Sequence, residues 1–241
     1  MDLSITQVPI WISVVFGLSM ISVPVLLISR LAITPSIDTR YLPSRDKARQ
    51  IAVFYFLFFL LMALISLTGF FTVNTLPPRV IVFAAIPLLL FYLLYVQRQA
   101  WFKSAFAAVT VAQLIQVHVF RFVGVFFYIL YAYEALPRPF AVIGGTGDIL
   151  TALLAIPTVY FLKKKAAFAK ALAWAWNIFG LLDILSVIAV AIVTTRFAIA
   201  NNETGVGQFG TFPFSWIPTF APATIIFLHI LIFRKLRTPK A

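Results

Sequence analysis

The sequence predicts an all-α, multi-pass membrane protein: a single domain over residues 1–241 that forms a bundle of seven transmembrane helices. Three observations predict this fold. Of the 241 residues, 62% are hydrophobic and only 11% are charged, whereas a soluble domain carries about a quarter charged residues. The apolar residues lie in long runs, and the basic residues are concentrated in alternate links between those runs. This composition excludes a soluble enzyme, a nucleic-acid-binding domain and a disordered chain.

Seven stretches provide the roughly 20 mostly apolar residues that a helical span needs. We expect these spans at residues 9–28, 51–73, 80–96, 104–133, 140–162, 171–195 and 218–233. Prolines mark several links, among them Pro77 and Pro78 before the third span and Pro137 and Pro139 before the fifth. Backbone groups inside lipid must pair within their own segment, so long unbroken runs indicate helices rather than strands.

The first three spans are apolar throughout. No basic residue precedes the first span and no small-residue cleavage site follows it, so we interpret it as a retained helix rather than a signal peptide. The second span contains an aromatic run at residues 54–59. These three spans predict membrane insertion and no chemistry.

The later spans carry the polar residues. Intramembrane ionisable residues are costly and are therefore candidates for a functional site. We expect a ligand-binding site built from eight residues of spans four to seven: Gln113, Gln116, His118, Arg121, Asp148, Asn177, Asp183 and His229.

Arg121 needs a negatively charged partner inside the membrane. A helix rise of about 1.5 Å per residue places Arg121, Asp148 and Asp183 at similar depths. We expect Arg121 to pair with Asp148, with Asp183 or with both, because an unpaired buried charge is costly. Two carboxylates against one guanidinium leave an excess negative charge, which suggests a proton, a cation or a basic ligand; alternatively, one aspartate stays neutral. A functional interpretation puts the unpaired carboxylate in a cavity open to the outside, and a structural one makes the group a packing device only.

Helical phase adds three expectations for spans four and five. At about 100° per residue, Gln113, Gln116 and Arg121 fall within one broad stripe of the fourth span. Gly124 would let another helix approach beside the arginine. The glycine-rich residues 144–148 favour either close helix packing or a short helix break that frees backbone groups for a ligand.

The link at residues 201–218 is rich in glycine and aromatic residues. Two placements are open: a cap that folds back over the outer mouth of the bundle, or a segment that lies in the membrane interface.

Orientation follows from the distribution of basic residues. Fifteen lie in the links after the first, third and fifth spans and in the C-terminal segment, and three lie on the other side. Cytoplasmic loops are enriched in Lys and Arg, which predicts an outside N-terminus and a cytoplasmic C-terminus. The lipid bilayer then accounts for the net charge of +12 without a nucleic-acid partner. The chain has no Cys, which excludes disulfides and thiolate chemistry.

Two resemblances bear on function. The seven-helix topology resembles that of microbial rhodopsins, but the last span has no interior lysine for a retinal Schiff base. The motifs Arg121-x-x-Gly124, Leu136-Pro137-x-x-Phe140-Ala141 and Gly145-x-Gly147-Asp148 resemble a family of small bacterial multi-pass membrane proteins without an assigned activity. This resemblance implies a bacterial inner-membrane location and no mechanism.

Four functions remain open. The first is binding or transport of a small molecule, ion or proton in a polar pocket among helices four to seven, open to the outside. The second is a b-type haem protein with His118 and His229 as axial ligands. The third is an intramembrane enzyme with His118 or an aspartate as its acid–base group. The fourth is a structural or assembly protein. No residue spacing predicts a metal site.

Overall fold

The computed structural model describes residues 8–33, 44–203 and 205–238, and this part of the chain is helical and contains no β-strand. Within it, seven helices are long and apolar enough to cross a membrane. They are α1 (Ile10–Leu31), α2 (Arg45–Leu67), the run Ile81–Arg98, the run Val111–Ala132, α7 (Arg138–Lys163), α8 (Ala169–Asn201) and α9 (Trp216–Arg237). The predicted all-α fold with seven apolar spans is confirmed.

Two of these spans are not uniform α-helices. The third consists of η1 (Ile81–Ala85), α3 (Ile86–Leu90), η2 (Phe91–Tyr95) and η3 (Val96–Arg98), of which η1 and η2 are π-helical. The fourth consists of α5 (Val111–Val117), the 3₁₀ stretch η4 (His118–Gly124) and α6 (Val125–Ala132). Changes of helix type inside a span rotate the faces of the residues that follow.

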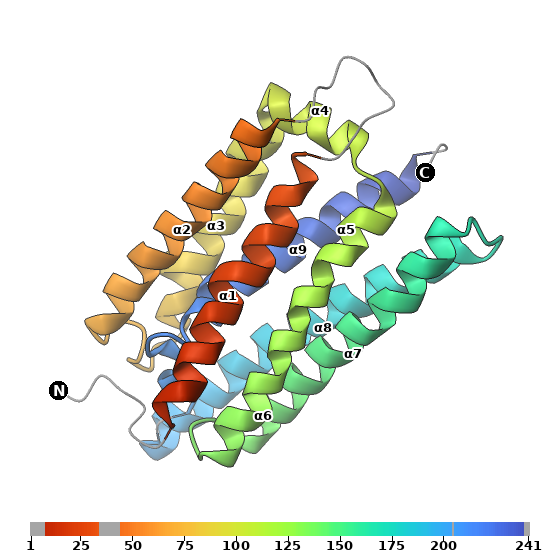
Figure 1. Cartoon of the computed structure of the whole chain (residues 1–241). Coiled ribbons are helices and arrows are strands. Elements are labelled where there is room, and N and C mark those ends of the chain that lie inside the picture. Colours follow the sequence, from red (N-terminus) through yellow and green to blue (C-terminus); the bar gives the residue numbers. More distant parts are fainter. Residues whose placement is uncertain (1–7, 34–43, 204, 239–241) are drawn as a thin grey trace.

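Helix α9 lies in the middle of the bundle and is the most buried span (Figure 1). It contacts α8, α5, α2 and the third span, whereas α7 packs along α8 and η4. Successive spans alternate in direction, so the links that are rich in basic residues lie together at one end of the bundle. We call the end formed by Leu31, Arg45, Arg98, Lys163 and Arg237 the basic end, and the other end the N-terminal end. Arg40 and Lys240, which contribute to the predicted orientation, lie outside the described residues.

The predicted fourth span, 104–133, is wrong at its start. Residues Ala100–Ala108 form a separate helix, α4, at the basic end (Figure 1). Val109 and Thr110 are extended, and α5 begins only at Val111. A capping box between Thr110 and Gln113 stops the helix from continuing backwards. An apolar run does not reveal such a turn, because α4 and α5 are both apolar.

Two further spans, the second and the sixth, differ from their predicted bounds. The second span was expected at 51–73, but α2 begins at Arg45, where the Ser44 side chain accepts a hydrogen bond from the Lys47 amide. It ends before Gly69, whose φ of 75° a helix cannot contain. The sixth span was expected at 171–195, but α8 extends to Asn201 and is capped by the left-handed Asn202. Hydropathy averages the polarity of a window of residues. It does not detect a capping hydrogen bond or a residue in the left-handed conformation.

The link between α8 and α9 folds back into the bundle at the N-terminal end. Phe209 and Phe214 are buried, and Phe209 packs on Phe127 and Phe140. The backbone at Gly207 approaches that of Thr72 closely, so that a Cβ on this glycine would lie 2.6 Å from the Thr72 carbonyl oxygen. Of the two placements predicted for this link, the inward-folded cap is the observed one.

Candidate functional site

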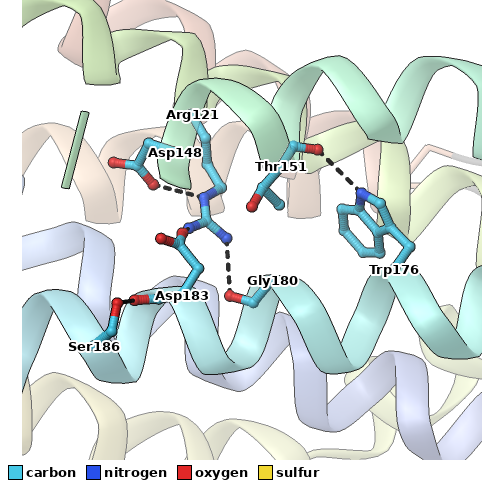
Figure 2. Close-up of polar contacts among 7 residues, drawn as sticks. All are labelled: Arg121, Asp148, Thr151, Trp176, Gly180, Asp183 and Ser186. Atoms are coloured by element: carbon cyan, nitrogen blue, oxygen red, sulfur yellow. Dashed lines mark hydrogen bonds and ion pairs between the residues drawn. The ribbon is translucent and has the colours of Figure 1, made fainter. Parts of the chain in front are cut away.

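Arg121 is completely buried and lies between two carboxylates (Figure 2). Its Nε donates a hydrogen bond to Asp148 Oδ1 at 2.7 Å, and Nη2 donates to Asp183 Oδ2. Nη1 donates to the backbone carbonyl of Gly180 at 3.1 Å. We call Arg121, Asp148 and Asp183 the ion triad. The predicted pairing of Arg121 is confirmed with both partners, and the expectation that one carboxylate stays unpaired is wrong.

The 3₁₀ geometry of η4 explains why this arginine faces the interior. A 3₁₀-helix has three residues per turn, so residues three apart lie on the same face. His118, Arg121 and Gly124 are spaced in this way, and all three are buried. One face of η4 therefore presents the imidazole to α8 and α9, the guanidinium to α7 and α8, and the glycine to α7.

Glycines bring the helices of the ion triad together. A Cβ at Gly124 would lie 2.6 Å from the Asp148 Cβ and 3.2 Å from the carbonyl oxygen of Gly145. A Cβ at Gly147 would overlap the Asp183 carboxylate. Helix α7 continues through residues 144–148 without interruption. Close packing is therefore the observed role of this glycine-rich stretch, and the predicted helix break is wrong.

With both aspartates ionised, the ion triad has one more negative charge than positive. Within the described part of the chain, Arg121 is the only side chain that makes a polar contact with either carboxylate group, since Ser186 donates to the backbone carbonyl of Asp183 (Figure 2). A buried charge without a full counter-charge is costly. The arrangement therefore has the electrostatic properties of a site for a cation.

A cavity reaches Asp148 from the N-terminal end of the bundle. It has an empty volume of about 780 Å³, part of it open to the surroundings. Apart from Asp148 its lining is mainly apolar and aromatic, with Phe71, Phe127, Phe140 and Phe209 among the lining residues. The inward-folded link contributes part of the wall, through Phe209 and its neighbours. We call this space the Asp148 cavity.

The two histidines meet on the other side of Arg121. The ring centroids of His118 and His229 are 4.4 Å apart, and Trp176 packs against both rings. His229 Nδ1 is 2.7 Å from Asn177 Oδ1, and Asn177 Nδ2 donates to the His229 backbone carbonyl at 3.2 Å. Besides the ion triad, five further residues were predicted for the site, and three of them form this cluster: His118, Asn177 and His229.

Some polar atoms of this cluster are buried without a hydrogen-bond partner. Both ring nitrogens of His118 and the hydroxyl of Thr151 are in this state. Buried polar groups are normally hydrogen-bonded, and exceptions call for an explanation. A Cβ on Gly180 would lie 3.0 Å from both Thr151 Cγ2 and His229 Nε2, so the glycine makes room for this cluster.

The histidine pair does not fit haem. Two imidazoles that bind one iron from opposite faces have ring centres roughly 6 Å apart, given metal–nitrogen bonds of about 2 Å. The observed 4.4 Å is direct ring contact. Among the described residues no group of three or more His, Cys, Asp and Glu is arranged to hold a metal ion. His118 is also completely buried, which argues against the enzyme alternative in which it contacts substrate.

The two glutamines lie outside the site. The Gln113 side chain accepts hydrogen bonds from the Thr110 amide and hydroxyl, each at 2.8 Å, and so caps α5. Gln116 is exposed on the outer surface of the bundle. At 100° per residue Gln116 already lies about 140° from Arg121, so the predicted stripe was too broad to place both in the interior. Three-residue turns from His118 onward widen the separation to about 160°.

Sequence reasoning missed Thr151, Trp176 and Gly180. The Trp176 indole donates to the Thr151 carbonyl at 3.0 Å and so connects α8 to α7 (Figure 2). A signal was present for Thr151, because it lies three residues after Asp148 and therefore on the same helical face. No signal in the sequence distinguishes Trp176 from the tryptophans at the membrane interface.

The fold and the site define a class: an all-helical protein with seven membrane-length apolar helices. A buried ion triad lies between the fourth, fifth and sixth of these helices. The chain belongs to the family described as a domain of unknown function (DUF8737), whose model matches residues 76–237. The matched region contains the whole ion triad and both histidines, and it excludes α1 and α2. No curated protein and no solved structure matches the chain.

Proposed function

We propose that this protein binds a small organic cation in the Asp148 cavity. The observation that carries the proposal is the position of Asp148, which touches the guanidinium of Arg121 on one side and lines the cavity on the other. A cation at the free side of this carboxylate would neutralise the excess negative charge of the ion triad.

The chemistry of the cavity wall favours an organic cation over a bare metal ion. Aromatic faces attract cations, most strongly where water is excluded, and apolar walls bind the hydrocarbon part of a ligand. A metal ion would require several oxygen or nitrogen ligands, and among the described residues of this lining Asp148 is the only acidic one.

Along α9, Ile217, Pro218, Ala221 and Pro222 line the Asp148 cavity, and residues from Thr224 onward line a separate cavity at the basic end.

We further propose that the basic end faces the cytoplasm of a bacterium and that the N-terminus lies outside, in the inner membrane. The support is the excess of Lys and Arg at one end and the resemblance to bacterial membrane proteins. Single cysteines in this Cys-free chain test the orientation. A cysteine at Asn202 that reacts with an impermeant maleimide in intact cells supports it, and one at Lys170 that reacts instead contradicts it.

The ligand proposal is tested with two probes of different size, tetraethylammonium and radiolabelled tetraphenylphosphonium. We expect saturable binding of at least one probe to purified wild-type protein, and a loss of at least about tenfold in affinity in Asp148→Asn. Asp46→Asn is the matched control, because it removes an exposed carboxylate at the basic end. Absence of saturable binding for both probes, or unchanged binding in Asp148→Asn, would overturn the proposal.

A further inference from the structure

A second cavity, at the basic end, has an empty volume of about 1130 Å³, part of it open to the surroundings. Its lining comes from α1, α2, η2, α4 and α9 and is apolar or aromatic apart from a few polar groups. Its polar groups are Lys47 and Gln50 of α2 and a hydroxyl chain in which Tyr92 bonds Tyr55 at 3.0 Å and Thr224 at 3.1 Å. We call this space the basic-end cavity.

Helix α4 covers one side of the basic-end cavity. Trp101, Phe102 and Phe106 line the cavity, whereas Lys103 and Ser104 on the opposite face are exposed. A short helix with an aromatic inner face and a polar outer face, placed at the end of a helical bundle, is typical of an element that lies in a membrane interface. Its position puts the cavity at the level where lipid head groups meet acyl chains.

Cations lie against the aromatic residues of α4. Lys47 Nζ is 5.9 Å from the centre of the Trp101 ring, and Arg234 and Lys235 lie 5.3 and 4.9 Å from that of Phe106. In the described part of the chain none of these three cations forms an ion pair with a carboxylate; Lys47 donates to Gln50 and Arg234 to a glutamine. Among the described residues, the cavity lining contains no acidic residue. The positive charge at this rim is therefore available to an anion.

We propose that the basic-end cavity binds one anionic phospholipid, with an acyl chain among the aromatic residues and the phosphate at Lys47. An apolar cavity with a basic rim is complementary to a molecule that has a hydrocarbon tail and an anionic head. The inference requires that the helices lie in a bilayer and does not depend on cation binding at Asp148. Lys47 precedes the region that the family model matches, so this lipid site extends beyond that region.

Quenching of Trp101 by brominated lipids tests this proposal. The protein is placed in phosphatidylcholine nanodiscs that contain phosphatidylglycerol or phosphatidylcholine brominated on the acyl chains. The difference in fluorescence between wild type and Trp101→Phe isolates the Trp101 signal. We expect brominated phosphatidylglycerol to quench this signal at a mole fraction about fivefold lower than brominated phosphatidylcholine, the ratio for one basic residue near an anionic lipid.

Variants of Lys47 decide whether the preference comes from this cavity. Lys47→Gln should remove the preference and Lys47→Arg should keep it, whereas Lys170→Gln is the control for an exposed lysine at the same end. Equal quenching by the two lipids in wild type, or a preference that survives Lys47→Gln, would overturn the proposal. Brominated oleate that quenches more strongly than phosphatidylglycerol would identify a free fatty acid as the occupant and would also overturn it.

Discussion

Replacing Arg121 should destabilise the bundle far more than replacing either of its partners. In Arg121→Met two buried carboxylates lose their counter-charge, and the Gly180 carbonyl loses a donor. Removal of one partner of a buried ion pair costs about 3–5 kcal/mol. In Asp148→Asn, by contrast, the amide oxygen can still accept from Arg121 Nε, and one guanidinium remains opposite one carboxylate. We expect that loss to be about 1 kcal/mol, the difference between a charge-assisted and a neutral hydrogen bond.

The free energies of unfolding of Arg121→Met and Asp148→Asn should therefore differ by at least about 2 kcal/mol, or roughly 30-fold in the unfolding equilibrium constant. Unfolding in mixed micelles with increasing dodecyl sulfate, followed by circular dichroism, measures this difference. Arg138→Met is the control, because it makes the same substitution at an exposed position and should change stability by no more than about 0.5 kcal/mol.

A triple variant separates lost charge balance from lost packing. Arg121→Met combined with Asp148→Asn and Asp183→Asn contains no buried charge at this site, and we expect it to be more stable than Arg121→Met alone. The reasoning is refuted if the triple variant is no more stable than the single one. It is also refuted if Arg121→Met unfolds no more readily than Asp148→Asn.

Two further predictions follow from the packing around the site. Gly147→Ala should destabilise the bundle by about 1–3 kcal/mol in the same assay, because the added methyl group overlaps the Asp183 carboxylate. Gly17→Ala is the control: its Cβ would lie 3.6 Å from its nearest neighbour, so this variant should be neutral or slightly stabilising. His118→Phe should change stability by less than about 1.5 kcal/mol, because neither ring nitrogen has a partner to lose, whereas His229→Phe breaks the bond to Asn177 and should cost about 1–3 kcal/mol. Equal losses in Gly147→Ala and Gly17→Ala, or a larger loss in His118→Phe than in His229→Phe, would contradict these assignments.

The sequence by itself determined the class of fold and the partners of the buried arginine. Long apolar runs leave no alternative to helices, because backbone groups in lipid have to pair within each segment. Arg121, Asp148 and Asp183 were predictable as a group, because unlike charges at similar depth must meet when water is absent. These conclusions depend on composition and spacing alone, which tertiary packing does not change.

The tertiary structure alone decided which faces meet. The turn at Val109 is hidden in an apolar run, and the change to three residues per turn at His118 puts His118, Arg121 and Gly124 on one face. Which carboxylate would also face a cavity depends on the link that folds back beside Phe127, a contact between residues about 80 positions apart. A linear pattern records the polarity of each residue. It does not record local helix type or the contacts of distant segments, and those set the direction of each side chain.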